Sequence, residues 1–331
     1  MEILNKMRFD FRRIKAKKIL NYMLLKISCI LKSKNSLGMP VRIVFEPASL
    51  CNLKCEICPH YKNDLIRNGT FLGFDVFKKT IDEIGNYLLS VTFAGIGEPL
   101  LNPELPKMVD YANKKGIYTQ IFTNLLKLDS AKADSLVKSC LDRVIISLDC
   151  SNKQTYQQLK NFDGFQVLCE KWNMLLERKK MLNSRLPYIS ISFVVTKNNE
   201  FEIEQARALA KKIGCDEFFT KTVNVCNAGE DGFSLDNSRF IAKNFNRYTI
   251  FNKKDKSNIH CPWLWNSTMV YSNADIGPCC FDVKAENVFG NIKEKSFRQI
   301  WNGDKIKKFR ALLKHDSDMI NICKSCTVKY K

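Results

Sequence analysis

The sequence predicts an α/β protein: a partial (β/α)6 barrel followed by a small cysteine-rich domain made of a β-hairpin and short helices. Short β-rich runs alternate with amphipathic helical segments through the first two thirds of the chain, the pattern of a parallel sheet with right-handed crossovers. A Gly-, Asn- and Asp-rich stretch ends this alternation, and five cysteines follow it. A chain of 331 residues fits one α/β unit of roughly 200–250 residues with an appendage better than two equal domains.

The strands and helices of the barrel can be placed in order along the chain. The predicted strands are 41–46, 90–95, 118–124, 143–149, 188–196 and 217–225. The predicted helices lie near 75–89, 103–115, 130–140, 165–183 and 199–213. In TIM-like barrels the chemistry gathers at the carboxyl ends of the strands. Residues 51–58 directly follow the first strand, so we expect them at that end.

The chain divides into four predicted parts. Residues 1–40 form a basic amphipathic helical segment, residues 41–225 the barrel, residues 226–260 a linker and residues 261–331 the small domain. In the small domain, the stretch "HCPWLWNSTMVYSNADIGPCCFD" is typical of a hairpin and "SFRQIWNGDKIKKFRALL" of one or two short helices.

The N-terminal segment is strongly basic, because its first 34 residues hold ten Lys or Arg against two acids in a chain of net charge +19. One apolar stripe is expected there, since apolar residues recur at helical spacing: Ile19, Leu20, Met23, Leu24, Ile27 and Leu31. One interpretation is a basic helix packed on the main domain, and another is a helix on an anionic membrane surface. Nucleic-acid binding is not expected, because no recognisable nucleic-acid module accompanies the charge.

Cysteine usage indicates a reducing compartment. The chain holds 14 cysteines, yet its start lacks a signal-peptide pattern: Lys26 interrupts the apolar run and no small-residue cleavage site follows. The same run is too short to span a bilayer, which takes about 20 apolar residues. We therefore expect a cytoplasmic protein whose clustered cysteines serve metal binding or catalysis.

The first cysteine cluster, "CNLKCEIC", places Cys51, Cys55 and Cys58 on one loop. Three thiolates can hold a cubic 4Fe-4S cluster by three corners and leave the fourth iron open to an outside ligand. The C-x3-C-x2-C spacing strongly resembles that of the radical S-adenosylmethionine (radical SAM) superfamily. The resemblance implies that these cysteines bind the cluster, that its open iron binds S-adenosylmethionine, and that a 5'-deoxyadenosyl radical abstracts hydrogen from the substrate. The alternative is a Cys3His zinc site that uses His60.

The second motif, "SVTFAGIGEPLLNP", ends a strand in Gly95, Gly97 and Glu98. It resembles the Gly-Glu motif of the superfamily, which contacts the amino group of the cofactor. Glycine admits close approach of the backbone, and a carboxylate suits an ammonium group. By the same resemblance, polar residues at later strand ends are predicted to contact the cofactor or substrate: Thr123, Asn124, Ser147, Asp149 and Thr196. Ordinary caps of the following helices are the alternative for each of them, and Leu125 replaces the glycine that often follows Thr-Asn.

The second cysteine set is Cys261, Cys279, Cys280, Cys323 and Cys326. The residues alone suit either zinc or an iron-sulfur cluster. With "CPW", "GPCCFD" and "CKSC" in this order, the tail resembles a shortened SPASM-type domain, which implies one auxiliary 4Fe-4S cluster. Neighbouring strand residues point to opposite faces, so Cys279 and Cys280 should not both bind it, and family position favours Cys279. Four protein ligands would make the cluster an electron conduit, whereas three would leave an iron open to substrate.

The resemblance thus implies a radical SAM enzyme with an auxiliary cluster that takes up or relays the electron. Its predicted substrate is a peptide or protein; the alternative is a carbohydrate or small-molecule alcohol. About 40 residues precede the first strand, which we expect to be too few for a separate leader-peptide-binding domain. The basic surface suits an acidic electron donor of the flavodoxin or ferredoxin type. A basic zinc-binding protein is the non-enzyme alternative.

Overall fold

The computed structural model describes residues 13, 15–58, 67, 69–223, 240–242, 261–315, 319–324 and 326. The predicted linker lies outside the described residues except for 240–242, and so does His60 of the alternative zinc site. Thirteen of the fourteen cysteines lie within the described residues.

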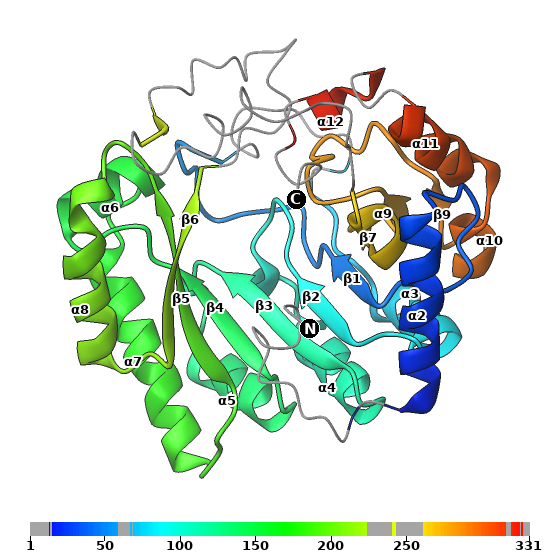
Figure 1. Ribbon diagram of the computed structural model, residues 1–331. Helices are drawn as coiled ribbons and strands as arrows, with labels where there is room; N and C mark the ends of the chain where they lie inside the picture. Colours follow the sequence, from blue (N-terminus) through cyan, green and yellow to red (C-terminus); the bar gives the residue numbers. More distant parts are fainter. Residues whose placement is uncertain are drawn as a thin grey trace.

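All six predicted barrel strands are present and parallel (Figure 1). They are β1 (Arg42–Phe45), β2 (Ser90–Phe93), β3 (Tyr118–Thr123), β4 (Arg143–Ser147), β5 (Tyr188–Val195) and β6 (Glu217–Thr222). Each pairs with the next in chain order, and β6 and β1 are not paired with each other. The sheet is therefore a partial barrel, as predicted, and the carboxyl ends of its six strands all lie at the same edge.

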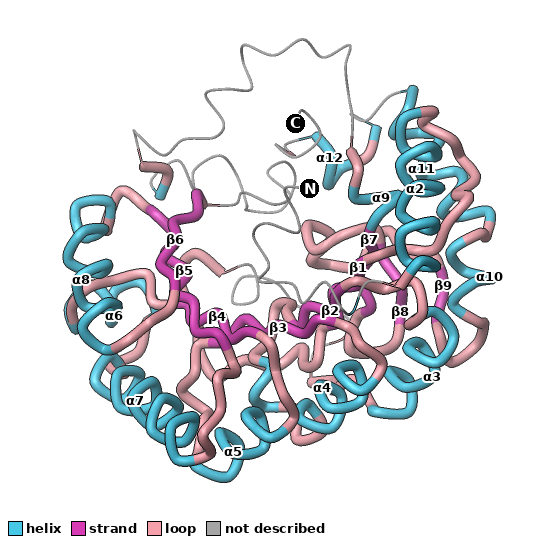
Figure 2. Tube along the Cα trace, turned by 60° about the horizontal axis from the view of Figure 1, so that its bottom comes forward, coloured by secondary structure: helices cyan, strands magenta, loops and turns pink. Residues whose placement is uncertain are grey.

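Helices cover the convex side of this sheet, and the strands form an open arc inside them (Figure 2). They are α3 (Phe74–Ile84), α4 (Leu105–Lys114), α5 (Ser130–Lys138), α6 (Lys153–Lys160), α7 (Phe165–Met181) and α8 (Ile203–Ile213). Their buried faces form a single apolar core with the strands, in which Phe77 on α3 lies 4.8 Å from Phe45 and 5.6 Å from Phe93, ring centre to ring centre. Five of these helices match the sequence prediction, and α6 is additional.

The small domain extends the barrel sheet. Strand β7 (Ser267–Val270) pairs in parallel with β1, and β8 (Asp275–Gly277) and β9 (Gly290–Asn291) continue the sheet antiparallel. Short helices flank these strands: α9 (Trp263–Asn266), α10 (Phe297–Trp301), α11 (Asp304–His315) and α12 (Asn321–Lys324). The predicted hairpin and short helices are thus present. Strand β7 pairs directly with β1, and the loop that holds the first cysteine cluster follows β1. The sheet pairing therefore connects the small domain with the strand that leads into that loop.

The N-terminal helix α2 (Ala16–Ile30) packs on α9, but not through its apolar stripe. Its buried face carries Asn21, whose side chain exchanges hydrogen bonds with the main chain of Met39 at 2.7 and 2.8 Å. Leu25 and Cys29 complete this face. Most of the stripe expected from the sequence is solvent-exposed instead, because these buried residues seat the opposite face of the helix. Among the helices described, none has the length and apolar content needed to cross a bilayer.

Candidate active site

The loop after β1 holds the first three cysteines, each partly buried, at the carboxyl edge of the sheet. The amide of Leu53 lies 3.5 Å from the Cys51 sulfur, and Asn124 Nδ2 lies 3.9 Å from the same atom. Farther along, the amide of Glu56 donates to the carbonyl of Leu159 on α6 at 3.0 Å. The loop is therefore fixed to β3 on one side and to α6 on the other.

Gly95 and Gly97 let the end of β2 approach this loop closely. A Cβ on Gly97 would lie 2.1 Å from the carbonyl oxygen of Ala48 and 2.5 Å from that of Leu50, and a Cβ on Gly95 would lie 2.5 Å from Glu46. In the same turn the amide of Glu98 donates to Leu50 at 2.7 Å. These glycines thus pack against the protein itself, and their contact with the cofactor stays a prediction.

Glu98 is buried, and its carboxylate ties the ends of β2 and β3 together. Oε1 accepts from Thr123 Oγ1 at 2.6 Å and from the amide of Leu100 at 3.0 Å, while Oε2 accepts from the amide of Asn124 at 2.8 Å. Burial raises its pKa against these hydrogen bonds. A carboxylate oxygen can accept two bonds, so Oε2 retains capacity for a cationic donor. Glu98 can therefore accept a hydrogen bond from an ammonium group, as the sequence predicts.

The turn after β3 places two more of the predicted residues. Thr123 binds Glu98, and Asn124 Nδ2 donates to Asn52 on the cysteine loop at 3.0 Å. Leu125 has φ of +65°, in the left-handed region that glycine favours. This leucine therefore adopts the backbone of the glycine it replaces, and its side chain is buried in the core.

The ends of β4 and β5 hold Ser147, Asp149 and Thr196. Asp149 is buried, forms an ion pair with Lys160 of α6, and accepts from the amide of Val194 at 2.7 Å. Thr196 is also buried and accepts from the amide of Asn198 at 3.2 Å. Asp149 and Thr196 thus support the strand ends, whereas Ser147 is partly exposed there. The cofactor contacts of these three residues stay predictions.

Lys160 was not anticipated from the sequence. Burial raises the pKa of the Cys55 thiol, and the positive charge of Lys160 opposes that rise more than any other charge does. No motif marks this lysine, since it is simply the last residue of a short polar helix. Its place beside the cysteine loop depends on the packing of α6.

The second cysteine set encloses a small cavity of about 90 Å³. All five cysteines line it, and every other lining residue carries a largely apolar side chain: Trp263, Leu264, Pro278, Phe281, Phe309, Leu313 and Ile322. Burial raises the pKa of Cys261 to about 12 and that of Cys279 well above its usual value. Thiolates are unfavourable in such a place unless a metal provides positive charge. The structure thus brings together all five cysteines predicted for this site.

Cys279 and Cys280 face different surroundings. The pKa of Cys279 is raised by burial and further by the charges of Cys280, Cys261 and Cys323. Cys280 is exposed and also lines the larger cavity inside the barrel, and its charge acts on Lys221 of β6. Both cysteines follow the end of β8 and both line the smaller cavity, so the alternation of strand residues expected from the sequence does not separate them. Cys279 is the more deeply buried of the two, and its role as the auxiliary ligand stays a prediction.

The larger cavity, about 550 Å³, lies between the first cysteine loop and the small domain. Its lining includes Ile57 and Cys58 from the first cysteine loop and Gly95 from the end of β2. Cys280 and Phe281 line it from the small domain. A molecule in this cavity can therefore touch both cysteine sites at once.

Two cations of this cavity have unused hydrogen-bonding capacity. Arg67 is buried and donates through Nε to both oxygens of Glu46 at 3.1 and 3.0 Å, but its Nη1 has no partner among the described residues. Burial lowers the pKa of Lys221 to about 8, and no described carboxylate lies within ion-pair distance of it. Asp282, the acid of the cavity, already accepts from the amides of Glu286 and Asn287.

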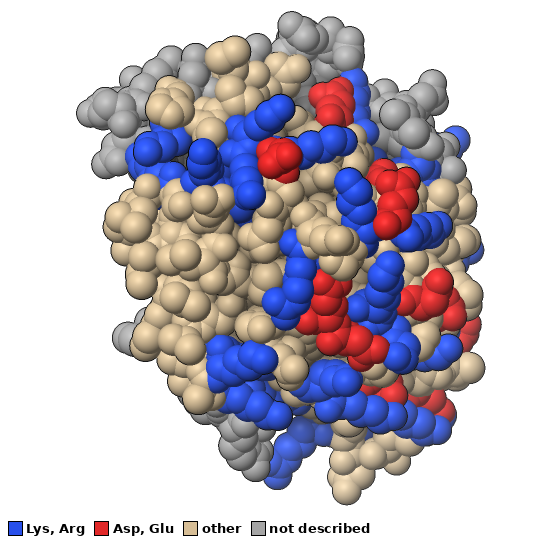
Figure 3. All heavy atoms as spheres, turned by 90° about the vertical axis from the view of Figure 1, so that its right-hand side faces the viewer, with Lys and Arg blue, Asp and Glu red and all other residues tan. Residues whose placement is uncertain are grey.

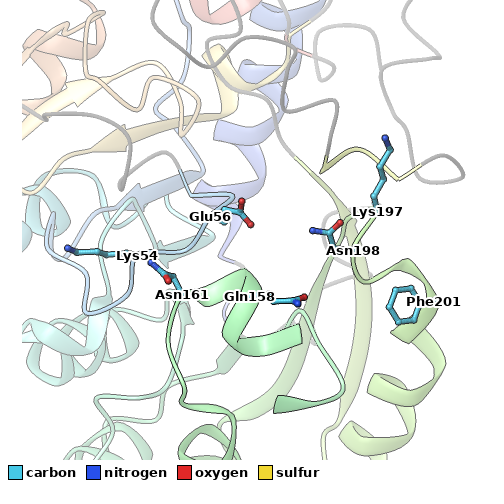
Figure 4. A pocket seen from close by; sticks show the side chains of 7 residues that line it. All are labelled: Lys54, Glu56, Gln158, Asn161, Lys197, Asn198 and Phe201. Atoms are coloured by element: carbon cyan, nitrogen blue, oxygen red, sulfur yellow. The ribbon is translucent and has the colours of Figure 1, made fainter. Parts of the chain in front are cut away.

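A wider depression lies outside the cysteine loop (Figure 4). Lys54 and Glu56 of the loop border it together with Gln158 and Asn161 near the end of α6, and Lys197, Asn198 and Phe201 follow β5. Its volume is about 810 Å³. The backbone that carries Cys55 runs along this depression, between Lys54 and Glu56.

Two family models match the chain. The family model described as the radical SAM superfamily matches residues 45–210, half of the chain. The chain belongs to the radical SAM superfamily. A second family model, described as an iron-sulfur cluster-binding domain and named SPASM, matches residues 261–327. The loop of Cys51, Cys55 and Cys58 and the second cysteine set thus lie within the matched regions.

Similar proteins match the whole chain or part of it at low identity. A tungsten-containing aldehyde ferredoxin oxidoreductase cofactor-modifying protein of Pyrococcus furiosus is 25% identical over 87% of each chain. A PqqA peptide cyclase of Rhodopseudomonas palustris is 29% identical over 38% of this chain and 33% of that protein. The structure of Streptococcus suis SuiB bound to its precursor peptide SuiA matches with a TM-score of 0.65 at 18% identity, covering 88% of this chain and 71% of that one. This likeness shows the fold.

Membership of the radical SAM superfamily implies a 4Fe-4S cluster and S-adenosylmethionine, and the residues present fit both. Burial raises the pKa of Cys51 to about 12, so this thiolate also requires a positively charged ligand. In the described part of the chain no three His, Cys, Asp or Glu side chains converge on a point suited to one metal ion. A cubic cluster instead takes each thiolate at a separate corner. In the SPASM region, the buried Nε1 of Trp263 lacks an acceptor among the described residues, and cluster sulfides are acceptors.

Proposed function

We propose that this radical SAM protein modifies a peptide or protein by abstracting hydrogen from it, with one auxiliary 4Fe-4S cluster assisting. The observation that carries the proposal is the cavity of about 550 Å³, which is lined by Cys58 on one side and Cys280 on the other. A substrate there would lie beside the radical source, with only Cys280 and Phe281, which line both cavities, between it and the auxiliary site. The peptide class is supported by relatives whose names or titles include peptide cyclases and a precursor-peptide complex.

The chain's own residues have distinct parts in this proposal. Cys51, Cys55 and Cys58 hold the catalytic cluster, and Glu98 holds the ammonium group of S-adenosylmethionine. When bound, the reduced cluster would supply one electron that breaks a carbon–sulfur bond of S-adenosylmethionine, releasing methionine and a 5'-deoxyadenosyl radical that takes a hydrogen atom from the substrate. The auxiliary cluster would take up the unpaired electron of the resulting substrate radical as that radical loses a proton. Arg67 and Lys221 offer donors to carbonyl or carboxylate oxygens, the acceptors that a peptide carries along its length.

The auxiliary cluster is assigned to Cys261, Cys279, Cys323 and Cys326. These four leave no open iron, so the cluster conducts electrons rather than binding substrate. Cys280 then remains available to the substrate cavity that it lines.

Reduction of the catalytic cluster requires an electron-donor protein, and we propose a donor of the flavodoxin or ferredoxin type. The depression bordered by Lys54 and Glu56 lies along the loop backbone that carries Cys55 (Figure 4). Electron transfer favours a short path, and the basic net charge suits an acidic donor. A reducing cytoplasmic location, predicted from cysteine usage, is part of this proposal.

The proposal predicts that a peptide substrate stimulates cofactor cleavage. Anaerobically reconstituted protein would be mixed with dithionite, S-adenosylmethionine and each short peptide encoded beside its gene. We expect 5'-deoxyadenosine to form faster with the correct peptide, and mass spectrometry to show a mass change in that peptide. A set of sugars and small alcohols would be tested in parallel. Oxidation of one of these with no change in any peptide would contradict the peptide assignment while leaving the radical chemistry intact.

A small-molecule substrate is the second candidate. The relative that matches along 87% of each chain is named for modifying a cofactor rather than a peptide. A carbohydrate or small alcohol would fit within the same cavity, and the parallel assay above separates the two classes.

A further inference from the structure

Helix α2 exposes an apolar stripe to solvent. Half of the exposed large hydrophobic side chains in the described residues, seven of fourteen, fall between residues 19 and 37. They are Ile19, Leu20, Met23, Ile27, Ile30, Leu31 and Leu37, hereafter the α2 stripe. Leu20 is 59% exposed, Ile30 72% and Leu31 64%. Single exposed hydrophobic residues are common, but such a concentration marks an interaction surface.

The α2 stripe cannot turn inward, because the opposite face of the helix is fixed to the protein. Asn21 binds the main chain of Met39, and Lys18 Nζ donates to the carbonyl of Gly116 at 2.9 Å. After the helix, Trp265 Nε1 donates to the carbonyl of Ser33 at 2.9 Å. The exposed side chains therefore form a fixed surface of the folded protein.

The surroundings of the α2 stripe are basic and lack acids along the chain. No Asp or Glu occurs between Arg13 and Phe45, and Lys17, Lys26 and Lys34 are exposed there. Figure 3 shows the side of the molecule that carries α2: a broad area without charged side chains is bordered above and below by Lys and Arg, and most acidic side chains lie away from it. An apolar face flanked by cations is the pattern of a helix that lies in a membrane interface.

We propose that α2 binds the enzyme peripherally to a bilayer that contains anionic lipid. The α2 stripe would enter the boundary between headgroups and acyl chains, while the neighbouring lysines contact anionic headgroups. A second copy of the chain is a poorer occupant, because two α2 surfaces facing each other would bring like charges together. The proposal is independent of the substrate and of the cofactors.

Vesicle sedimentation of the full-length protein tests this inference. We expect binding to vesicles of mixed phosphatidylglycerol and phosphatidylcholine, weakening with added salt, and little binding to phosphatidylcholine alone. The double variant Leu20→Ser, Ile27→Ser should bind about tenfold more weakly, since it removes apolar side chains from the interface. The matched control is Met181→Ser, Phe162→Ser, which removes two exposed hydrophobic residues elsewhere and should bind like wild type.

Three outcomes of the vesicle assay would overturn the proposal. They are no sedimentation with anionic vesicles, equal loss of binding in the control variant, and equal binding to both vesicle types. Analytical ultracentrifugation of the same proteins tests whether a second copy of the chain covers the α2 stripe. A wild-type dimer that becomes a monomer in the Leu20→Ser, Ile27→Ser variant would assign the stripe to self-association instead. Circular dichroism checks that both double variants are folded. Cofactor cleavage is measured separately, so failure here leaves the proposed function untouched.

Discussion

Replacing Cys55 with alanine is expected to reduce formation of 5'-deoxyadenosine to the level of a protein-free control. The cluster would lose one of its three protein ligands, and no other cysteine among the described residues lies on that loop except Cys51 and Cys58. Two thiolates cannot hold the cube in the geometry that leaves one iron for S-adenosylmethionine. The measurement is 5'-deoxyadenosine by chromatography after reduction with dithionite.

The control for this change is Cys140→Ala, because Cys140 is exposed on the opposite edge of the sheet, before β4. That variant should cleave S-adenosylmethionine like wild type. If the Cys55→Ala protein keeps wild-type cleavage, the ligand assignment is wrong. If both variants lose cleavage, cysteine oxidation or unfolding is responsible, and the loop is not identified as the site.

The second large effect concerns the auxiliary cluster and separates Cys279 from Cys280. Cys279→Ala should lose about four of roughly eight irons, the content of one of two cubes, and should stop product formation. It should still form 5'-deoxyadenosine, because the catalytic cluster does not depend on this cysteine. Iron and sulfide analysis after anaerobic reconstitution, together with product assays, measures both effects.

Cys280→Ala is the matched control, since it changes the adjacent thiol, which lines the cavity of about 550 Å³. It should retain full iron content. Loss of iron in this variant with normal iron in Cys279→Ala would reverse the assignment. Normal product yield in a Cys279→Ala protein that has lost its auxiliary iron would remove this cluster from the reaction.

The barrel was predictable because its strands are short, β-rich and regularly separated by amphipathic helices. Helix α6 was not, because of its eight residues only Tyr156 and Leu159 supply an apolar pattern. The packed face of α2 was also missed. Its apolar residues predicted a stripe, but hydrogen bonds of Asn21 and the buried Leu25 and Cys29 seat the other face.

Some residues of the site could be predicted from the sequence, and others could not. Cysteine spacing and the Gly-Glu turn are local in sequence, so both cysteine sites could be proposed from the sequence alone. Arg67 and Lys221 could not, because nothing near them marks a motif and the folded barrel alone places them in one cavity. Ala274, with φ of +77° in the β7–β8 turn, likewise adopts a glycine-like backbone that no propensity rule anticipates.

The most direct test of the account is electron paramagnetic resonance of the reduced, reconstituted enzyme with and without S-adenosylmethionine. Cys279→Ala protein simplifies the spectrum, because it should contain only the catalytic cluster. S-adenosylmethionine is expected to change the signal of that cluster, because it would bind the iron that Cys51, Cys55 and Cys58 leave open. An identical spectrum in both samples would contradict it.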